Sequence, residues 1–170
     1  VLFASGDSRT LAELVPCRNV GLRLDTALSW DLPAHLSMLA QVRARADEFD
    51  ILHFHLDCHH FPLFHDIADR TITTVHGRQD IKDLRGLYRF YPDFPLVSVS
   101  DSQRRPVPHL RWICTVHHGC PLTQYAFTPR PKGDYLAFLG RIAPEKGVDK
   151  AIAIAERSGL PLRIAAKIDP

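Results

Sequence analysis

Short, continuous runs of apolar residues recur along the chain, separated by polar, turn-forming segments. Runs without alternation of apolar and polar positions are typical of strands buried on both faces of a parallel sheet. Residues 71–75 are the clearest example, because β-branched residues favour strands and the run ends at His76 and Gly77. The expected strands are residues 1–5, 22–24, 51–56, 71–75, 96–100, 113–116, 135–139 and 162–166.

Between these runs, apolar residues return at the spacing of an amphipathic helix. Leu36, Leu39, Ala40 and Val42 form such a face, and Pro33 suits the first turn of that helix. The expected helices are residues 33–49, 61–68, 81–91 and 147–157, with a short one in DSQRR that its Asp or Ser caps and Pro106 stops. Because strands and helices alternate, the pattern predicts an α/β fold, a Rossmann-like, doubly wound parallel sheet.

Residues 120–132 interrupt the pattern with three prolines and are expected to form a linker. We therefore expect residues 1–131 to form a first, partial domain with its linker, and residues 132–170 to begin a second domain. A strand starts at the first residue and another lies just before the last. We expect the sequence to be a fragment of a longer protein, truncated at both ends.

Composition and charge exclude several classes. The chain has 170 residues, of which 45% are hydrophobic and 24% charged, as in ordinary globular proteins. A net charge of +2 gives no sign of a nucleic-acid partner. No apolar run reaches the roughly 18 residues of a membrane-spanning helix. The four cysteines form no C-x-x-C pair and are interpreted as the reduced thiols of a cytosolic protein.

Candidate chemistry follows the strands, where ligands of parallel α/β sheets bind. The most informative case is the turn with Arg141, Glu145 and Lys146, between a strand and a helix. Two cations at a helix N-terminus oppose the helix dipole, which makes sense if a diphosphate binds there. Gly140 would let the backbone approach that ligand, and Gly147 would let the turn enter the helix. The alternative is two surface cations, one of them paired with Glu145.

The segment YLAFLGRIAPEKGVDKAIAIA, residues 135–155, resembles the beginning of the donor-binding domain of family 4 retaining glycosyltransferases, which have the GT-B fold. TTVHGR is similar to the strand whose terminal His faces the bound sugar in that family. LVSVSDSQR and VHHGCPLTQYAFTP are similar to the end of the acceptor domain. The resemblance covers nearly the whole chain, is strongest around residues 135–150, and is weaker before residue 70.

The resemblance implies an enzyme of carbohydrate biosynthesis. Such an enzyme moves a sugar from a nucleotide-diphosphate sugar to a carbohydrate or glycolipid acceptor, with retention of configuration. His76 would lie near the donor sugar, and Arg141 and Lys146 would hold the diphosphate and stabilise it as it leaves. The other donor-binding residues would be Gly77, Gly119, Gly140, Glu145 and Gly147. No metal or other cofactor is required, and the expected location is the cytoplasm, with peripheral contact of the parent enzyme at the inner membrane.

The sequence also departs from the family. The family's first strand with its glycine-rich loop, and the downstream pair of glutamates with the pocket for the base, have no counterpart here. The chain therefore corresponds to the first lobe in part and the beginning of the second, and we expect it to be inactive alone.

The segment HFHLDCHH supports a rival interpretation. On a strand, His53, His55 and Asp57 would point to one face, close to the H-x-H-x-D-H pattern of metallo-β-lactamase-type hydrolases, although Cys58 replaces the last His. Such a dinuclear site would need ligands from elsewhere, and the candidates are His76, His117 and His118. In the glycosyltransferase interpretation His55 and Asp57 instead line the acceptor-side cleft. A non-catalytic nucleotide-binding module is the third alternative.

Overall fold

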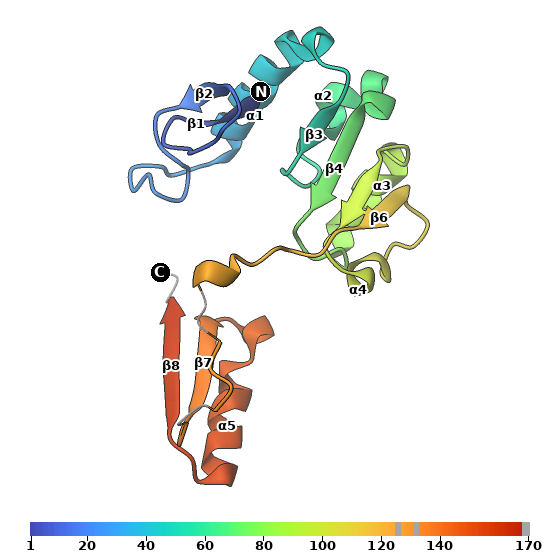
Figure 1. Cartoon of the computed structure of the whole chain (residues 1–170). Coiled ribbons are helices and arrows are strands. Elements are labelled where there is room, and N and C mark those ends of the chain that lie inside the picture. Colours follow the sequence, from blue (N-terminus) through green and yellow to red (C-terminus); the bar gives the residue numbers. More distant parts are fainter. Residues whose placement is uncertain (125–126, 131–132, 168–170) are drawn as a thin grey trace. The chain divides into compact units, whose positions relative to one another are not determined.

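The computed structural model describes residues 1–124, 127–130 and 133–167, and the chain divides between Gly119 and Cys120 into two compact units. The expected linker, residues 120–132, begins at this division. Figure 1 traces both units along the chain.

A four-stranded parallel sheet forms the centre of the first unit. Its strands are β3 (Leu52–Phe54), β4 (Thr71–Val75), β5 (Leu96–Ser98) and β6 (Trp112–Thr115). The order across the sheet is β3-β4-β5-β6, and every pair is parallel. An α/β architecture with a parallel sheet, consistent with a Rossmann-like fold, is therefore confirmed. β4 and β5 lie inside this sheet, whereas β6 is an edge strand, because it pairs with β5 alone among the described strands.

A second, two-stranded sheet pairs β1 (Leu2–Ser5) with β2 (Leu14–Arg18), also in parallel. The expected strand at residues 22–24 is wrong, since these residues form turns. The strand β2 contains Pro16, which argues against a strand in the sequence. Its missing N–H costs nothing here. The amide of Leu2 donates to Glu13 O at 2.8 Å, so the backbone of Glu13 faces β1. Because successive residues face opposite edges, Pro16, three residues later, directs its backbone away from β1.

The helices of the first unit connect these strands. They are α1 (Leu32–Ala44), η1 (Ala46–Glu48), α2 (Phe61–Phe64), η2 (His65–Arg70), α3 (Lys82–Phe90) and α4 (Asp101–Arg104). Proline occupies the first turn of both α1 and α2. The side chain that caps α4 is Ser100, which precedes DSQRR and accepts a hydrogen bond from the Gln103 amide at 3.3 Å. The expected cap from the Asp or Ser within that sequence is therefore wrong.

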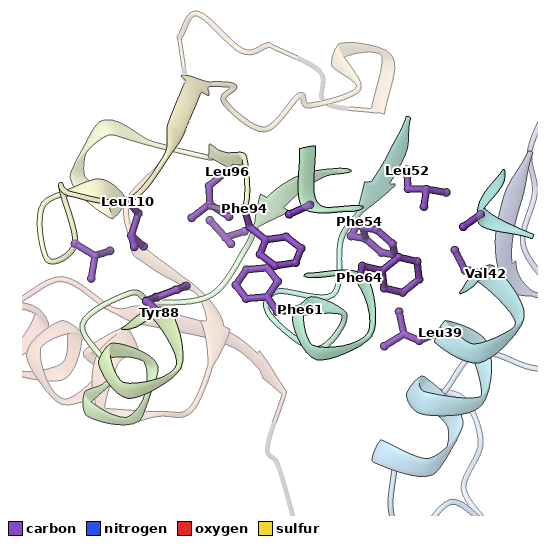
Figure 2. Close-up of a cluster of buried hydrophobic side chains, with 14 residues drawn as sticks. Leu39, Val42, Leu52, Phe54, Phe61, Phe64, Tyr88, Phe94, Leu96 and Leu110 are labelled. Atoms are coloured by element: carbon purple, nitrogen blue, oxygen red, sulfur yellow. The ribbon is translucent and has the colours of Figure 1, made fainter. Parts of the chain in front are cut away.

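Aromatic side chains fill the core between the sheet and its helices, as Figure 2 shows. Phe61 and Phe94 stack with ring centroids 4.1 Å apart. Phe54 stacks on the buried ring of His60 at 3.9 Å and meets Phe64 edge-on at 4.9 Å. These rings hold β3 and α2 together, and thereby fix where the segments after β3 and β4 emerge.

The second unit contains one β–α–β element. Its described parts are η3 (Leu122–Gln124), β7 (Leu136–Arg141), η4 (Pro144–Lys146), α5 (Val148–Ser158) and β8 (Leu162–Lys167). β7 and β8 pair in parallel along their whole length. In the described residues of both units, no helix combines the length and the apolar character that crossing a membrane requires.

Candidate functional site

Four imidazole rings, each near the next, lie near the carboxyl end of the first unit's sheet; we call them the histidine column. His53 belongs to β3, His55 follows β3, His76 follows β4, and His118 lies after β6. The ring centroids are 4.4, 5.3 and 5.3 Å apart in that order. Parallel strands direct their carboxyl ends to one edge, so segments distant in sequence meet there.

A hydrogen bond joins the two central rings of the column. His55 Nδ1 and His76 Nε2 are 2.9 Å apart, and a neutral imidazole carries one N–H, so one ring donates and the other accepts. Partial burial lowers the pKa of His55, and the neighbouring His53 and His76 lower it further. The hydrogen bond requires that one of these two nitrogens carries a hydrogen and that the other accepts it.

His53 is held by a residue that the sequence did not single out. Its Nε2 lies 2.8 Å from the hydroxyl of Thr74 on the neighbouring strand β4. Burial, and then the nearby His76, lower the pKa of His53 as well. No sequence signal marked Thr74, because only the register of β3 on β4 brings the two side chains together.

Asp57 fixes the backbone at the end of β4. Its Oδ1 accepts hydrogen bonds from the amides of His76 at 3.0 Å and Gly77 at 3.3 Å. Asp57 itself has φ of 46°, a left-handed conformation that costs energy and is repaid by such bonds. A Cβ on Gly77 would stand 3.4 Å from the Asp57 carboxylate, which is van der Waals contact.

These contacts bear on the metallohydrolase alternative. The strand ends at Phe54, so Asp57 does not continue the face of His53 and His55, and its carboxylate is turned to backbone amides. Within the described parts of the chain, no group of three or more His, Cys, Asp or Glu side chains is arranged to hold a metal ion.

A cavity of about 370 Å³ opens beside His76. Its lining comes from the segments after β4 and β5: residues 76–80, Val99, Ser100, Ser102, Gln103 and Pro106. Gln103 shapes one wall: its Nε2 donates to Gly77 O at 2.8 Å and Val75 O at 3.1 Å, and its Oε1 accepts from Val99 N at 2.9 Å. The sequence missed this role, which depends on α4 folding back onto the end of β4.

The two histidine-rich segments, residues 53–60 and 117–118, contain further histidines with local partners. His117 Nδ1 lies 3.2 Å from Val99 O, while the next residue, His118, supplies the ring that joins the column. His59 Nδ1 is 2.6 Å from Leu56 O, and His60 is buried in the core. Gly119 has neither a left-handed φ nor a neighbour that would exclude a side chain, so neither its backbone conformation nor its surroundings require a glycine.

The basic turn of the second unit comprises Arg141, Glu145 and Lys146. Arg141 Nη2 and Glu145 Oε1 form an ion pair of 3.2 Å in which both side chains are exposed. Lys146 ends η4, its amide bonds to Ala143 O at 2.9 Å, and its side chain is exposed. The helix α5 starts directly after this turn and has no side-chain cap at its N-terminus. The alternative pairing of one cation with Glu145 is thus present.

The two glycines of this turn differ. Gly140 lies inside β7, paired with Ala166, and an added Cβ would meet only the Phe138 ring at an ordinary 3.7 Å. The end of the expected strand at residue 139 is therefore wrong, because β7 continues through Arg141. Gly147 has φ of 70°, which favours glycine, and it leads from η4 into α5 as expected.

The sequence-predicted site residues thus fall into two groups. His55, Asp57, His76 and Gly77 contact one another in the first unit. Gly119 is the last residue of the first unit. The remaining predicted residues belong to the second unit: Gly140, Arg141, Glu145, Lys146 and Gly147. Comparison of the sequence with protein-family models gives no match, and comparison with curated proteins gives no significant match either.

Proposed function

We propose that this chain forms part of a retaining glycosyltransferase that uses a nucleotide-diphosphate sugar. The observation that carries the proposal is the basic turn at the uncapped N-terminus of α5. Two cations, Arg141 at the end of β7 and Lys146 at the end of η4, precede this helix N-terminus, where first-turn amides and the positive end of a helix dipole attract anions, and this combination suits a diphosphate. The resemblance of residues 135–155 to the donor-binding domain of family 4 enzymes supports the same ligand.

The chemistry follows from where charge develops. As the glycosidic bond to the donor breaks, negative charge grows on the departing diphosphate, and fixed cations stabilise it most at that moment. Glu145 holds the planar fork of Arg141 in the free protein, and an incoming diphosphate would compete for that fork. Because these cations can neutralise the leaving group, the proposed reaction needs no metal.

His76 is proposed to lie near the donor sugar and to contact it during the reaction. It is held by a hydrogen bond from or to His55, by the stacked ring of His118, and by Asp57 at its amide. These contacts favour one orientation of the ring, which helps a residue that contacts the reacting sugar. The acceptor is proposed to be a carbohydrate or glycolipid, and the enzyme to work in the cytoplasm, with peripheral contact at the inner membrane.

Binding of the diphosphate is the first test. We expect the 170-residue protein to bind UDP, GDP or ADP more tightly than the matching monophosphate in titration calorimetry. Arg141→Ala and Lys146→Ala should each weaken diphosphate binding about tenfold, which is about 1.4 kcal/mol. The matched control is Arg157→Ala, which removes a cation from the last turn of the same helix. Equal affinity in all three variants would contradict the proposal.

Turnover is the second test, in an active enzyme that contains this chain. Arg141→Ala and Lys146→Ala should each cost about 3 kcal/mol of barrier, or roughly a hundredfold in rate. Melting temperatures should hardly change, because each substitution removes a cation from the unfavourable end of a helix dipole. Lys146→Arg should recover only part of the activity, since a planar fork does not reproduce a compact ammonium. Alanine variants that turn over like the parent would identify these residues as surface charges.

A further inference from the structure

The two sheets of the first unit end in two strand edges that line the same cavity. In the described residues, β1 pairs with β2 alone, and β3 is the first strand of the four-stranded sheet. A cavity of about 750 Å³ is lined by all of β1, all of β3 and one face of α1. Figure 1 shows β3 apart from the β1–β2 pair. We call this cavity the strand slot.

Hydrogen bonds show which backbone groups of β1 face away from its partner. The amide of Leu2 donates to Glu13 O at 2.8 Å, and that of Gly6 donates to Arg18 O at 2.7 Å. Successive residues of a strand direct their backbone groups to opposite edges, so the N–H and C=O of Phe3 point to the edge that β2 leaves open. Unpaired edge groups of this kind are a template for a further strand.

The same reasoning applies to β3. The amide of Thr73 donates to Pro95 O at 2.9 Å, so the backbone groups of Thr73 point toward β5. Those of the adjacent residue, Ile72, therefore point toward β3. In the parallel register His53 stands opposite Ile72, and its backbone groups therefore point away from β4. The N–H and C=O of His53 thus belong to the second open edge.

We propose that the strand slot is a docking site for an extended apolar peptide segment, which pairs with the open edges of β1 and β3 and joins the two sheets. The inference is independent of the proposed glycosyl transfer. The length of β1 suggests an occupant of about four residues in the extended conformation. Its side chains would cover apolar surface that is now open to solvent, including Val1 and Ile51, each 52% exposed, and Leu24, 70% exposed.

The unpaired backbone decides between a peptide and a lipid. An acyl chain would also cover the apolar walls, but it would bury the N–H and C=O groups of Phe3 and His53 without partners, which is costly. A second backbone satisfies these groups while its side chains fill the slot. The geometry therefore favours a peptide strand over a hydrocarbon chain.

Amide exchange provides a direct test. The probe is a peptide with blocked termini, added to the 170-residue protein. Its five central residues are valine and isoleucine, and lysines on both sides of them provide solubility. We expect hydrogen exchange at the amides of Phe3 and His53 to slow at least tenfold. The amides of Leu2 and Phe54, which already face partner strands, serve as internal controls and should change little. The same peptide with methylated backbone nitrogens should lose both binding and protection.

A pair of variants on α1 tests the location. Ala34 lines the slot, whereas Ala40 lies exposed on the same helix outside the slot lining. Ala34→Trp should fill the slot and abolish peptide binding, and Ala40→Trp should leave it unchanged. The proposal is overturned if the peptide fails to bind, if the methylated peptide binds equally well, or if Ala34→Trp has no effect. A fatty acid that binds without protecting Phe3 and His53, or a slot filled by a second copy at high concentration, would also overturn it.

Discussion

The buried imidazole of His60 connects the stability of the first unit to pH. It is fully buried, stacks on Phe54, and its Nε2 lies 3.0 Å from the hydroxyl of Thr73. Its Nδ1 is also buried, and no hydrogen-bond partner lies near it among the described residues. Burial, with a smaller contribution from His59, lowers the pKa of His60 to about 3. The folded protein therefore excludes a proton that the unfolded chain readily binds.

Stability should consequently fall as pH drops below the ordinary histidine pKa of 6.5. The sign follows from linkage, because the unfolded state binds more protons there. His60 alone should cost about 2 kcal/mol at pH 5 relative to pH 7. The measurement is urea unfolding at both pH values. His60→Phe, which retains the stacking, should lose most of this difference, whereas the exposed His65→Asn should retain it. Equal pH dependence in His60→Phe and the parent would contradict the assignment.

Backbone conformation gives opposite expectations for glycines in helical surroundings. Gly147 has φ of 70° at the start of α5, so Gly147→Ala should destabilise the second unit by about 1 kcal/mol. Gly86 lies inside α3 with no atom near the position of a Cβ, so Gly86→Ala should stabilise the first unit by up to about 1 kcal/mol. Thermal melting of each variant decides the signs. Stabilisation by Gly147→Ala would show that its left-handed conformation is not required.

At the scale of elements, the histidine column combines His53 of β3 with residues from the segments after β3, β4 and β6, and the metal content of the protein can be measured. We expect less than one zinc ion per chain after dialysis, and no change in the melting curve on adding EDTA. The reason is that Asp57 is bonded to the amides of His76 and Gly77, not free for a metal. Tight zinc at one or two ions per chain, with loss of stability on chelation, would favour the metallohydrolase alternative.

Elements with a strong local signal could be predicted from the sequence, and positions that depend on tertiary contacts could not. Residues 71–75 match β4, because their β-branched residues favour a strand and His76 and Gly77 follow it. The sequence did not predict β2, because a proline argues against a strand. Pro16 is tolerated there because its backbone points to the open edge of β2. The sequence placed His55, Asp57 and His76 at one end of the sheet. It could not choose between His117 and His118, nor identify Thr74 or Gln103, since register and the fold of α4 decide these contacts.

At the scale of the whole molecule, the division at Gly119 predicts two units of separate stability. Phe61 is fully buried in the first unit, so Phe61→Ala should cost that unit about 3–5 kcal/mol. Amide exchange in β7 and β8 should stay as in the parent, because their pairing is contained in the second unit. Exchange that accelerates equally in both units would show instead that they unfold together.

The order of the strands has a consequence for synthesis on the ribosome. In the four-stranded sheet each strand lies beside the one that precedes it in the chain. A newly made strand therefore finds its neighbour already present and closes only a short loop, which favours rapid folding. β3 and β4 can pair before β5 emerges, and β6 is added last. We expect this sheet to grow by stepwise addition during translation, without waiting for a distant partner to be made.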